Sequence, residues 1–559
     1  MKNIYTLVLA LFCFGAIAQE HLNPPASWYY EDLETNDLAT YNVGTFDHEV
    51  LEAEDNIMEQ ETGKDLCGRV LYEAFDTQTS GTWTKLPDGG RIWRMRFESP
   101  NALAVSAYFG KYHIPDGAGL WVWSADKSYF VGPYTSEDNN DHGKMATLDV
   151  YGAEAIIEYY EPADVVGTFE LETLGFGHFY DNVHDYREES QRGGSASCEI
   201  DVNCPEGDGW QAQRDATVWL RMTWDGFISN CSGVMVNNAD MDCDQLMLTA
   251  YHCTDVLQSD DFPLLIVRFN YERSGCDAGG LGAPHSRTGV IHLADSDDNG
   301  GQTGSDFAIF RVEDDIPEEW PIFYAGWDAT GLGATSGVGI HHPSGDIKKV
   351  STFTAPLISD TWWFANGAHW SVTWAETVTN HGVTEPGSSG SPIFSPDGLV
   401  VGTLTGGGSC CEGKSDPNNG CFSPTTPDLY GKFSYHWDGN TNATDDLQEI
   451  LDPNNTGLFE IFGAYAPNCD QVFVDVPELN WDQVGVFPNP TNDMVNFSIE
   501  GRFTLSTIAI YDAMGSLVRI ERPVGNKGVI NIEDVAPGVY YMTFTTQSNQ
   551  QVTKKVTKL

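Results

Sequence analysis

Three short segments carry residue types that together could perform nucleophilic catalysis. His252 (followed by a cysteine), Asp306 and Ser389 (in a glycine-rich run) occur in this order, 54 and then 83 residues apart. A serine hydroxyl is a weak nucleophile at neutral pH and needs an adjacent base. The imidazole of His252 could take its proton, and the carboxylate of Asp306 could hold that imidazole in the required tautomer. Each segment alone is weak evidence, but the order is one that unrelated folds use for such a triad, so it predicts covalent catalysis through Ser389.

The residues beside the serine and the histidine fit the same chemistry. Gly387 and Gly390 allow a sharp turn with no side chain in the way. The backbone amides of Gly387 and Ser389 are then expected to point into one hollow, an oxyanion hole, where a single donor is worth about 10²–10³ in rate. A disulfide from Cys253 to Cys231 would close a loop beneath the histidine and fix its backbone.

Other side chains that could do chemistry are expected to be structural. His341 and His342 precede a turn sequence, and we interpret them as structural. Trp362 and Trp363 are expected in the core or in a pocket wall, and the sequence does not separate these two places. Residues 295–299 form an acidic run that could hold calcium, but a solvated loop is the simpler interpretation. We therefore predict no metal site and no cofactor.

The start of the chain predicts export. Lys2 precedes an apolar stretch over residues 4–17, and Ala16-Ile17-Ala18 supplies the small residues of a signal peptidase site, so cleavage is expected after Ala18. The apolar stretch is too short to remain as a membrane anchor.

Cysteine usage agrees with an exported chain. Of twelve cysteines, one lies in the expected signal and Cys67 in the first unit, which leaves ten between Cys198 and Cys469. An even set confined to one region of an exported chain predicts five disulfides. No pair of Cys-x-x-Cys units occurs, which disfavours zinc.

The charge balance excludes one class of partner. The net charge is −52, with 29 basic and 81 acidic residues. Nucleic acids reward basic surfaces, so nucleic acid is not expected as a partner. An acidic surface of this size favours solubility.

The pattern of apolar runs divides the chain after the expected signal peptide into three units. Residues 19–192 hold short apolar and aromatic runs between turn residues, which predicts a β-rich unit. Residues 193–470 hold the three segments and the ten cysteines; recurring strand-like runs and glycine-rich turns predict an all-β barrel. A linker over 471–482 leads to residues 483–559, whose alternating pattern predicts a small β-sandwich.

A polar stretch separates the first two units. Residues 186–194 contain Arg192 followed by Gly193 and offer a natural place for a proteolytic cut. The stretch is either a linker between two permanent domains or a maturation site.

Longer segments of the middle unit resemble a known family. Residues 193 to about 465 resemble the bacterial lysyl endopeptidases, which are secreted proteases of the chymotrypsin fold. The matching segments are residues 197–202, 204–209, 236–238, 249–253, 325–328, 341–343 and 382–393. The resemblance implies a double β-barrel, a triad of His252, Asp306 and Ser389, and an oxyanion hole at Gly387 and Ser389.

The resemblance also implies a set of disulfides. By position, Cys231–Cys253, Cys204–Cys276 and Cys198–Cys411 match the three bridges of the family. Four further cysteines are additional here, and pairing Cys410–Cys421 as a short loop leaves Cys243–Cys469.

The resemblance implies a substrate pocket as well. Trypsin carries its specificity aspartate six residues before the serine, where this chain has Val383. The lysyl endopeptidases use a downstream aspartate, and Asp428 in Asp-Leu-Tyr-Gly-Lys matches its position. A carboxylate at a pocket floor pairs with a cationic side chain. Without the resemblance, Asp428 after Pro427 would be interpreted as a turn residue.

The chain departs from the family at two places. The family has a histidine, stacked on a tryptophan near the substrate, where this chain has Thr405. Trp362 or Trp363 is the candidate for the aromatic wall. The mature end of the family aligns with Gly193, which here follows Arg192 rather than a lysine, so the enzyme also accepts arginine or another protease activates it.

The outer units carry resemblances of their own. The first unit is similar to the pro-regions of the same family. The last unit resembles the C-terminal sorting domain of type IX secretion cargo, on Val486-Phe487-Pro488-Asn489-Pro490, Gly538-Val539-Tyr540 and the lysine tail. That implies contact with the secretion machinery and a final place in the medium or on the outer-membrane surface.

Together these observations predict a secreted serine endopeptidase, made as a zymogen, that cuts protein and peptide substrates after basic residues, lysine first, as a monomer. One alternative is a protease of broader or different specificity. The other is a surface adhesin on an inactive protease scaffold, against which the intact triad counts.

Overall fold

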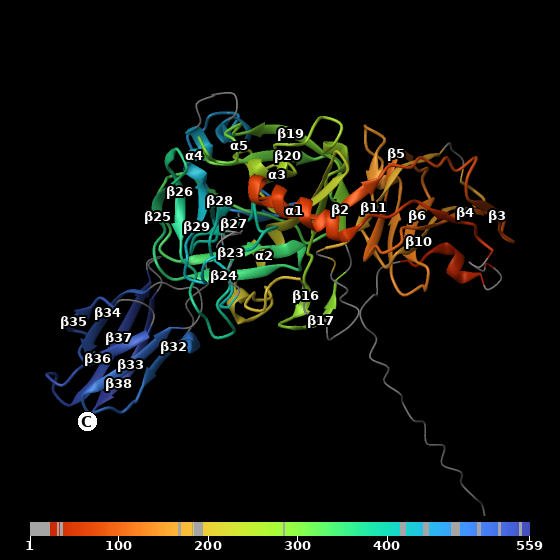
Figure 1. Ribbon diagram of the computed structural model, residues 1–559. Helices are drawn as coiled ribbons and strands as arrows, with labels where there is room; N and C mark the ends of the chain where they lie inside the picture. The colour runs from red at the N-terminus through yellow and green to blue at the C-terminus, as the bar shows by residue number, and fades with distance from the viewer. Residues whose placement is uncertain are drawn as a thin grey trace, which may run out of the picture.

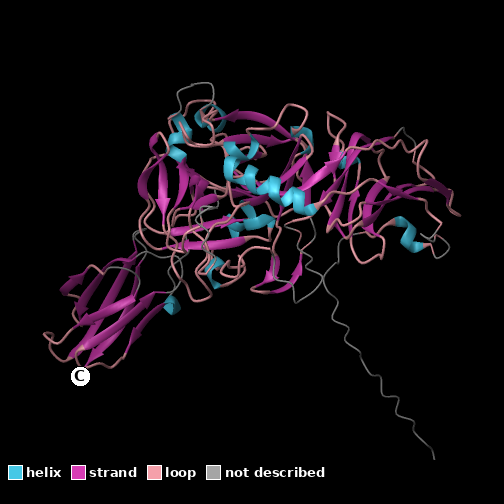
Figure 2. Cartoon of the chain, viewed as in Figure 1, coloured by secondary structure: helices cyan, strands magenta, loops and turns pink. Residues whose placement is uncertain are grey.

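The computed structural model describes most of the chain outside its first 22 residues. The described residues are 23–30, 33, 37–165, 169–181, 183, 194–282, 285–413, 421–439, 446–470, 481–499, 505–523, 527–546 and 551–559. The expected signal peptide with Ala18, the boundary at Arg192 and Gly193, and most of the expected linker lie outside them. Strands dominate all three regions (Figures 1 and 2), which confirms the all-β fold class. Among the described residues, no helix is long and apolar enough to cross a membrane.

The first region, up to residue 183, is built from strands and one long helix. A buried aromatic set that includes Trp93, Phe97, Tyr108 and Tyr159 forms its core. Its elements are η1 (Ala26–Tyr29), β1 (Thr40–Asn42), α1 (His48–Thr62), β2 (Asp65–Leu71), β3 (Thr82–Lys85), β4 (Arg91–Glu98), β5 (Ala104–His113), β6 (Gly119–Ser124), β7 (Phe130–Tyr134), η2 (Ser136–Asp138), β8 (Met145–Ala146), β9 (Val150–Tyr151), β10 (Glu154–Glu161) and β11 (Glu170–Phe179).

The first half of the middle region forms a sheet around buried aliphatic side chains. Alternation is weak in its strands because both faces are covered: every residue of β12 is buried. Its elements are η3 (Pro205–Gly207), α2 (Gln211–Ala216), β12 (Thr217–Trp224), β13 (Phe227–Met235), β14 (Leu246–Thr249), α3 (Tyr251–Thr254), η4 (Phe262–Leu264), β15 (Ile266–Phe269), β16 (Arg273–Gly275), β17 (Ala278–Leu281), β18 (His285–Thr288), β19 (Val290–Asp295) and β20 (Ala308–Val312).

The second half of the middle region forms a separate nine-stranded sheet in the order β24-β23-β27-β28-β29-β26-β25, with β22 and β30 beside it. The two halves share a core in which Val234 and Leu248 of the first pack with Ile340 and Val400 of the second. Its elements are β21 (Phe323–Tyr324), β22 (Trp327–Asp328), β23 (Gly337–His341), η5 (Pro343–Gly345), β24 (Lys349–Phe353), β25 (Ile358–Trp362), β26 (Ala365–Val372), β27 (Pro392–Phe394), β28 (Val400–Gly407), β29 (Asp428–Lys432), α4 (Phe433–Asp438), α5 (Leu447–Leu451), β30 (Glu460–Ile461) and β31 (Ala464–Tyr465).

One strand of the first region completes a sheet of the middle region. β2 pairs with β13 on one side and with β11 on the other, so a single twelve-stranded sheet runs through both regions. Trp219, Ile228 and Tyr271 of the middle region also belong to the aromatic core of the first. The helix that precedes β2, α1, extends over the middle region (Figure 1).

The last region has its own core of aliphatic and aromatic side chains, including Phe497, Ile508, Met542 and Phe544. It consists of a three-stranded and a four-stranded sheet, as expected for a small β-sandwich. Its elements are η7 (Trp481–Gln483), β32 (Val484–Phe487), β33 (Met494–Ile499), β34 (Leu505–Asp512), β35 (Leu517–Glu521), β36 (Lys527–Asn531), β37 (Gly538–Thr546) and β38 (Gln551–Lys558).

Candidate active site

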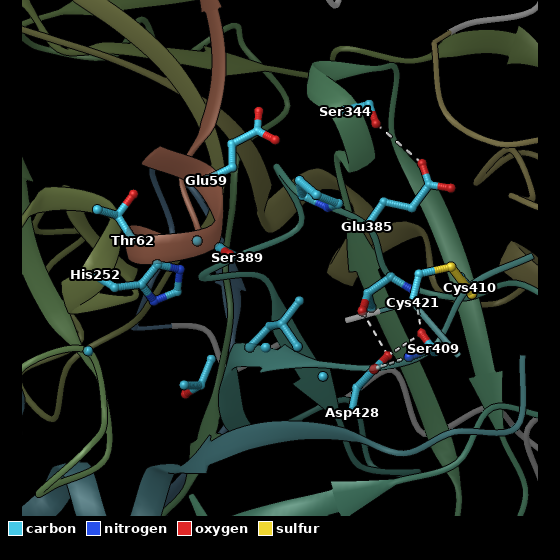
Figure 3. A pocket seen from close by; sticks show the side chains of 18 of the residues that line it. Glu59, Thr62, His252, Ser344, Glu385, Ser389, Ser409, Cys410, Cys421 and Asp428 are labelled. Atoms are coloured by element: carbon cyan, nitrogen blue, oxygen red, sulfur yellow. Dashed lines mark hydrogen bonds between the residues drawn. A yellow bond between two sulfur atoms is a disulfide. The ribbon is translucent and has the colours of Figure 1, made fainter. Parts of the chain in front are cut away.

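A cavity of about 960 Å³ brings together most of the residues singled out by the sequence. His252 from the first half of the middle region and Ser389 from the second half line it together. Figure 3 shows these two side chains close to each other, with Asp428 across the cavity. The remaining predicted pocket residues in its wall are Trp362, Trp363 and Thr405.

The imidazole of His252 is held by Asp306. Its Nδ1 lies 2.7 Å from Oδ2 of Asp306, and its backbone amide donates to Oδ1 at 2.9 Å. Asp306 is completely buried. Burial alone would raise the pKa of this carboxyl, but the nearby charge of His252 and its hydrogen bonds outweigh burial and lower the pKa. An ionised Asp306 is therefore in place to fix the orientation of the ring.

A second aspartate positions the first. Asp298 accepts the backbone amides of Gly301 at 2.8 Å and of Asp306 at 2.7 Å. These bonds hold Asp306 at a φ of +62°, an uncommon backbone conformation for a residue with a side chain. Burial, and then the charge of Asp306, raises the pKa of Asp298 to about 6. The acidic run at 295–299 was expected to be a solvated loop, yet this member of it is buried and supports the candidate triad.

Ser389 lies in a tight turn that needs glycine on either side. Gly387 and Gly390 have φ values of +86° and +77°, and a Cβ on Gly390 would lie 2.2 Å from the hydroxyl of Thr249. Ser232 fixes the turn, because its amide donates to the carbonyl of Ser389 at 2.8 Å and its hydroxyl donates to that of Gly387 at 2.9 Å.

The backbone amides of this turn divide into two groups. Those of Ser388, Gly390 and Ser391 each donate to a carbonyl. Among the described residues, those of Gly387 and Ser389 donate to no acceptor. Two unused amides on either side of one residue are what an oxyanion hole requires.

Asp428 lies buried at the first residue of β29 and lines the cavity. Its Oδ2 accepts from Trp374 at 2.6 Å, from the hydroxyl of Thr384 at 2.7 Å and from that of Ser409 at 2.6 Å, and its Oδ1 accepts the amide of Ser409 at 2.9 Å. Burial raises the pKa of Asp428, and these donors offset only part of that rise. Gly407 leaves room for the carboxylate, since a Cβ there would lie 2.0 Å from Oδ1.

An imidazole does lie beside Thr405, although the chain has no histidine at that position. Nε2 of His369, from β26, lies 3.1 Å from the hydroxyl of Thr405. The ring of Trp362 is tilted against it at a centroid distance of 6.4 Å. Burial lowers the pKa of His369 to about 4, so this ring is neutral near pH 7. Trp362 thus reaches a histidine, whereas Trp363 is 66% exposed at the rim of the cavity.

Among the described residues, five disulfides join the cysteines; three match the pairs that the resemblance implied, and two pair the four cysteines whose partners the sequence had left open. They are Cys198–Cys411, Cys204–Cys276, Cys231–Cys253, Cys243–Cys469 and Cys410–Cys421. The third links β13 to the residue after His252, which ties the histidine to the sheet. Cys67, in β2, is free and buried.

His341 and His342 have structural surroundings, as interpreted from the sequence. Both are fully buried. Nδ1 of His341 lies 2.8 Å from the hydroxyl of Ser388, and Nδ1 of His342 lies 2.9 Å from the carbonyl of Asp346. Burial and then the charge of Lys349 lower the pKa of His341 to about 3, so it stays neutral beneath the serine turn.

The sequence did not reveal that the first region also lines the cavity. Glu59, Thr62 and Gly63, from the end of α1 and the residue after it, belong to its wall (Figure 3). The pattern of α1 gave no sign of this, because the contact depends on which strand β2 pairs with.

Comparison with known proteins agrees with this site and with the last region. Residues 192–423 match the family model "Lysyl endopeptidase, C-terminal domain", and residues 485–558 match "Secretion system C-terminal sorting domain". A lysyl endopeptidase of Pseudomonas aeruginosa is 27% identical over 374 residues, which cover 64% of this chain and 76% of the relative. The recognition made from the sequence motifs is confirmed, and so is the expected secretion or attachment at the outer-membrane surface. The matches support a secreted protease of the lysyl endopeptidase family.

Proposed function

We propose that this chain is the precursor of a serine endopeptidase that cuts peptide bonds after basic residues, lysine first. The observation that carries the proposal is that His252, paired to the buried Asp306, lines one cavity with Ser389, whose turn has two backbone amides without an acceptor among the described residues. No cofactor enters the chemistry that follows.

The proposed reaction uses each of these groups once per half-reaction. His252 takes the proton of the Ser389 hydroxyl as its oxygen attacks the substrate carbonyl carbon, and the amides of Gly387 and Ser389 bind the resulting oxyanion. His252 then gives the proton to the departing amine, which leaves an ester on Ser389. Water, deprotonated by the same ring, hydrolyses that ester and restores the serine. Asp306 stabilises the imidazolium in both halves.

Asp428 is the proposed partner of the substrate's cationic side chain. Three neutral donors hold its Oδ2 in place, while Oδ1 accepts one amide, so the carboxylate is fixed in position and has no cation of its own among these contacts. A buried carboxylate without a cation gains the most from a substrate that brings one. A substrate with an apolar side chain would leave it unpaired, which is the basis for selectivity.

The first region is proposed to be a removable pro-region. A cut between Arg192 and Gly193 would give a mature chain whose second to fifth residues, 194–197, line the same cavity. Sequencing of the N-terminus of the secreted, active protein tests this. Active enzyme in which residues 19–192 are still covalently joined would reject it, whereas a cut but bound pro-region would agree with it.

A survey of cleavage sites tests the function. The secreted protein is incubated with a mixture of denatured proteins, and the new termini are read by mass spectrometry, with the Ser389→Ala protein as the matched control. Cuts after lysine, with fewer after arginine, and none by the alanine protein are expected. Cuts without preference for basic residues would show that the protein is a protease but would contradict the proposed role of Asp428. Substantial hydrolysis by the Ser389→Ala protein would contradict the assignment of the triad.

A further inference from the structure

Lys64, in the pro-region, places its ammonium group beside the proposed catalytic histidine. Its Nζ donates to the backbone carbonyl of His252 at 2.6 Å and to Oδ1 of Asp255 at 2.6 Å. The Lys64 side chain is 2% exposed and that of Asp255 is 29% exposed. A buried ammonium group is stable only where such charged and polar acceptors are arranged around it. The protease-like region therefore contains a cation site next to His252.

Strand pairing fixes Lys64 at this place. The residue that follows it, Asp65, is the first of β2 and pairs with Asn230 of β13, whose side-chain amide donates to Asp65 at 3.0 Å. Asn230 precedes Cys231, and the disulfide from Cys231 ends beside His252. A peptide strand that pairs with this edge of β13 therefore places one of its residues beside His252, namely the residue just before the one that pairs with Asn230.

The position of this strand relative to Ser389 shows which half of a substrate it imitates. Figure 3 shows Thr62, at the end of α1, on the same side of Ser389 as His252, and Asp428 on the other side. Oδ2 of Asp65 would lie 3.0 Å from a Cβ built on Gly387. Because the histidine protonates the departing amine, the part of the substrate that leaves first lies on the His252 side. The side chain recognised by Asp428 belongs to the part that stays on the serine.

The pro-region itself is not presented as a substrate at this point. α1 ends at Thr62, and Gly63 follows with a φ of +70°, a left-handed helix cap. The chain before Lys64 therefore coils into a helix instead of continuing as an extended strand across Ser389.

We propose that the carboxylate of Asp255 and the carbonyl oxygen of His252 form a subsite for a lysine or arginine side chain on the leaving-group side of the substrate, and that Lys64 fills it in the precursor. The proposal rests on the proposed function, because it concerns the same catalytic centre. Removal of the pro-region exposes the edge of β13 and leaves Asp255 without its ammonium partner. A substrate strand entering there restores both contacts when it carries a basic residue where Lys64 lies.

Two consequences follow from one site. The enzyme selects for basic residues on both sides of the cut, through Asp428 on one side and Asp255 on the other. The precursor is closed by the same contact that later helps to bind substrate, so a substrate with a basic residue at this position competes for the place of Lys64.

Acyl transfer tests the subsite separately from hydrolysis. The active enzyme is acylated with a small lysyl ester, and dipeptide amides are added as competing nucleophiles. The nucleophile's amine attacks the Ser389 ester in place of water, a new amide bond replaces the ester, and the amine's proton returns to the serine oxygen through His252. Initial rates of amide and acid formation give a partition ratio, compared for lysine, arginine and glutamine at the first and the second position of the dipeptide.

A basic side chain at one of these positions is expected to trap the acyl-enzyme roughly tenfold better than glutamine, the usual size of one charge-assisted hydrogen bond. In Asp255→Asn, basic and glutamine nucleophiles should give nearly the same partition ratio. The matched control is Asp260→Asn, which removes the same charge from an exposed residue five positions later. The subsite would be overturned if wild type and Asp255→Asn preferred basic nucleophiles equally, or if wild type showed no preference at either position. Hydrolysis of the lysyl ester in the same experiment would still support the proposed function. Absence of ester hydrolysis would reject the proposed function, and with it the subsite.

A second measurement needs no activity. In the uncut full-length chain carrying Ser389→Ala, hydrogen exchange reports how well the amides of β2 are protected. Lys64→Met should speed this exchange, because it removes the contacts to both His252 and Asp255. Asp255→Asn should also speed it, and adding Asp255→Asn to Lys64→Met should have no further effect, because Asp255 acts on β2 only through Lys64. Independent, additive effects of the two substitutions would contradict the assignment of the cation site.

Discussion

Two buried aspartates belong to the candidate site, and their pKa values move in opposite directions. Asp428 lines the cavity, whereas Asp306 contacts His252, which lines it. Asp306 and Asp428 are 0% and 1% exposed. Burial would raise the pKa of both, but at Asp306 the charge and hydrogen bonds of His252 reverse the effect. Within the described part of the chain, the donors to Asp428 are neutral groups of Trp374, Thr384 and Ser409, and its pKa stays raised.

The difference lies in the hydrogen-bond partner, because residue type and burial are the same for the two aspartates. A carboxylate hydrogen-bonded to an imidazole is favoured in its ionised form and can orient that ring, as the contacts of Asp306 allow for His252. A carboxylate surrounded by neutral donors is held in place but remains uncompensated, and it gains from an incoming cation. The same cavity can therefore separate the chemistry from the recognition of the substrate.

Of the changes that test this difference between the two aspartates, replacement of Asp306 by asparagine should reduce activity the most. Asparagine keeps the shape but cannot stabilise the imidazolium, and it allows the wrong tautomer of His252. We expect kcat to fall by roughly 10⁴-fold for lysyl and apolar substrates alike. Steady-state kinetics on both kinds of small ester measure this. A fall limited to the lysyl ester would mean that Asp306 belongs to recognition.

Replacement of Asp428 by asparagine should affect the substrates unequally. A bound lysine would lose its counter-ion, which costs about 2–5 kcal/mol, or roughly 30- to 4,000-fold in kcat/KM. Hydrolysis of an activated ester with an apolar side chain should change little, because it does not use this carboxylate.

Glu376→Gln is a suitable control for Asp428→Asn. It removes one charge from an exposed residue two positions after Trp374, which contacts Asp428. Its lysyl-to-apolar ratio should equal that of wild type. The same ratio in Asp428→Asn would make Asp428 a turn residue and would require another acid for the lysine preference.

The pH dependence should sharpen the contrast, with a smaller effect. Lysine needs the ionised form of Asp428, and the pKa of this group is raised above 3.8 in the free protein. As the pH falls through that raised pKa, the lysyl-to-apolar ratio of kcat/KM should drop, by up to about tenfold per pH unit. Asp306, with a lowered pKa, stays ionised over the same range, so the loss should be specific to lysine. Asp428→Asn should show a flat ratio, and a sloping ratio in that variant would assign the titration to another group.

The sequence predicted the parts of the site that carry motifs and missed the parts that depend on pairing. The order of His252, Asp306 and Ser389 was enough to predict them as a catalytic triad, and the glycines beside the serine predicted the turn. Asp298 was missed because it acts through the backbone amide of Asp306, and its only signal was an acidic loop. His369 was missed because it reaches Thr405 from a strand 36 residues away and no motif marks it.

The fold shows the same division. Apolar runs and turn residues predicted strands throughout, and the all-β class is confirmed. The same runs do not say which strand pairs with which. The pairing of β2 with β13 was therefore found only in the structure. It brings Asp65 to Asn230, 165 positions later in the chain, and Lys64 to His252, 188 positions later.

Covalent labelling of Ser389 tests the central claim most directly. An organophosphonate with a lysine-like side chain is reacted with the active secreted enzyme, and the adduct is located by peptide mapping and mass spectrometry. The proposed mechanism predicts one adduct, on Ser389, formed in proportion to the loss of activity and slowed by a lysyl substrate. Full loss of activity with an unmodified Ser389, or an adduct on another residue that accounts for that loss, would contradict it.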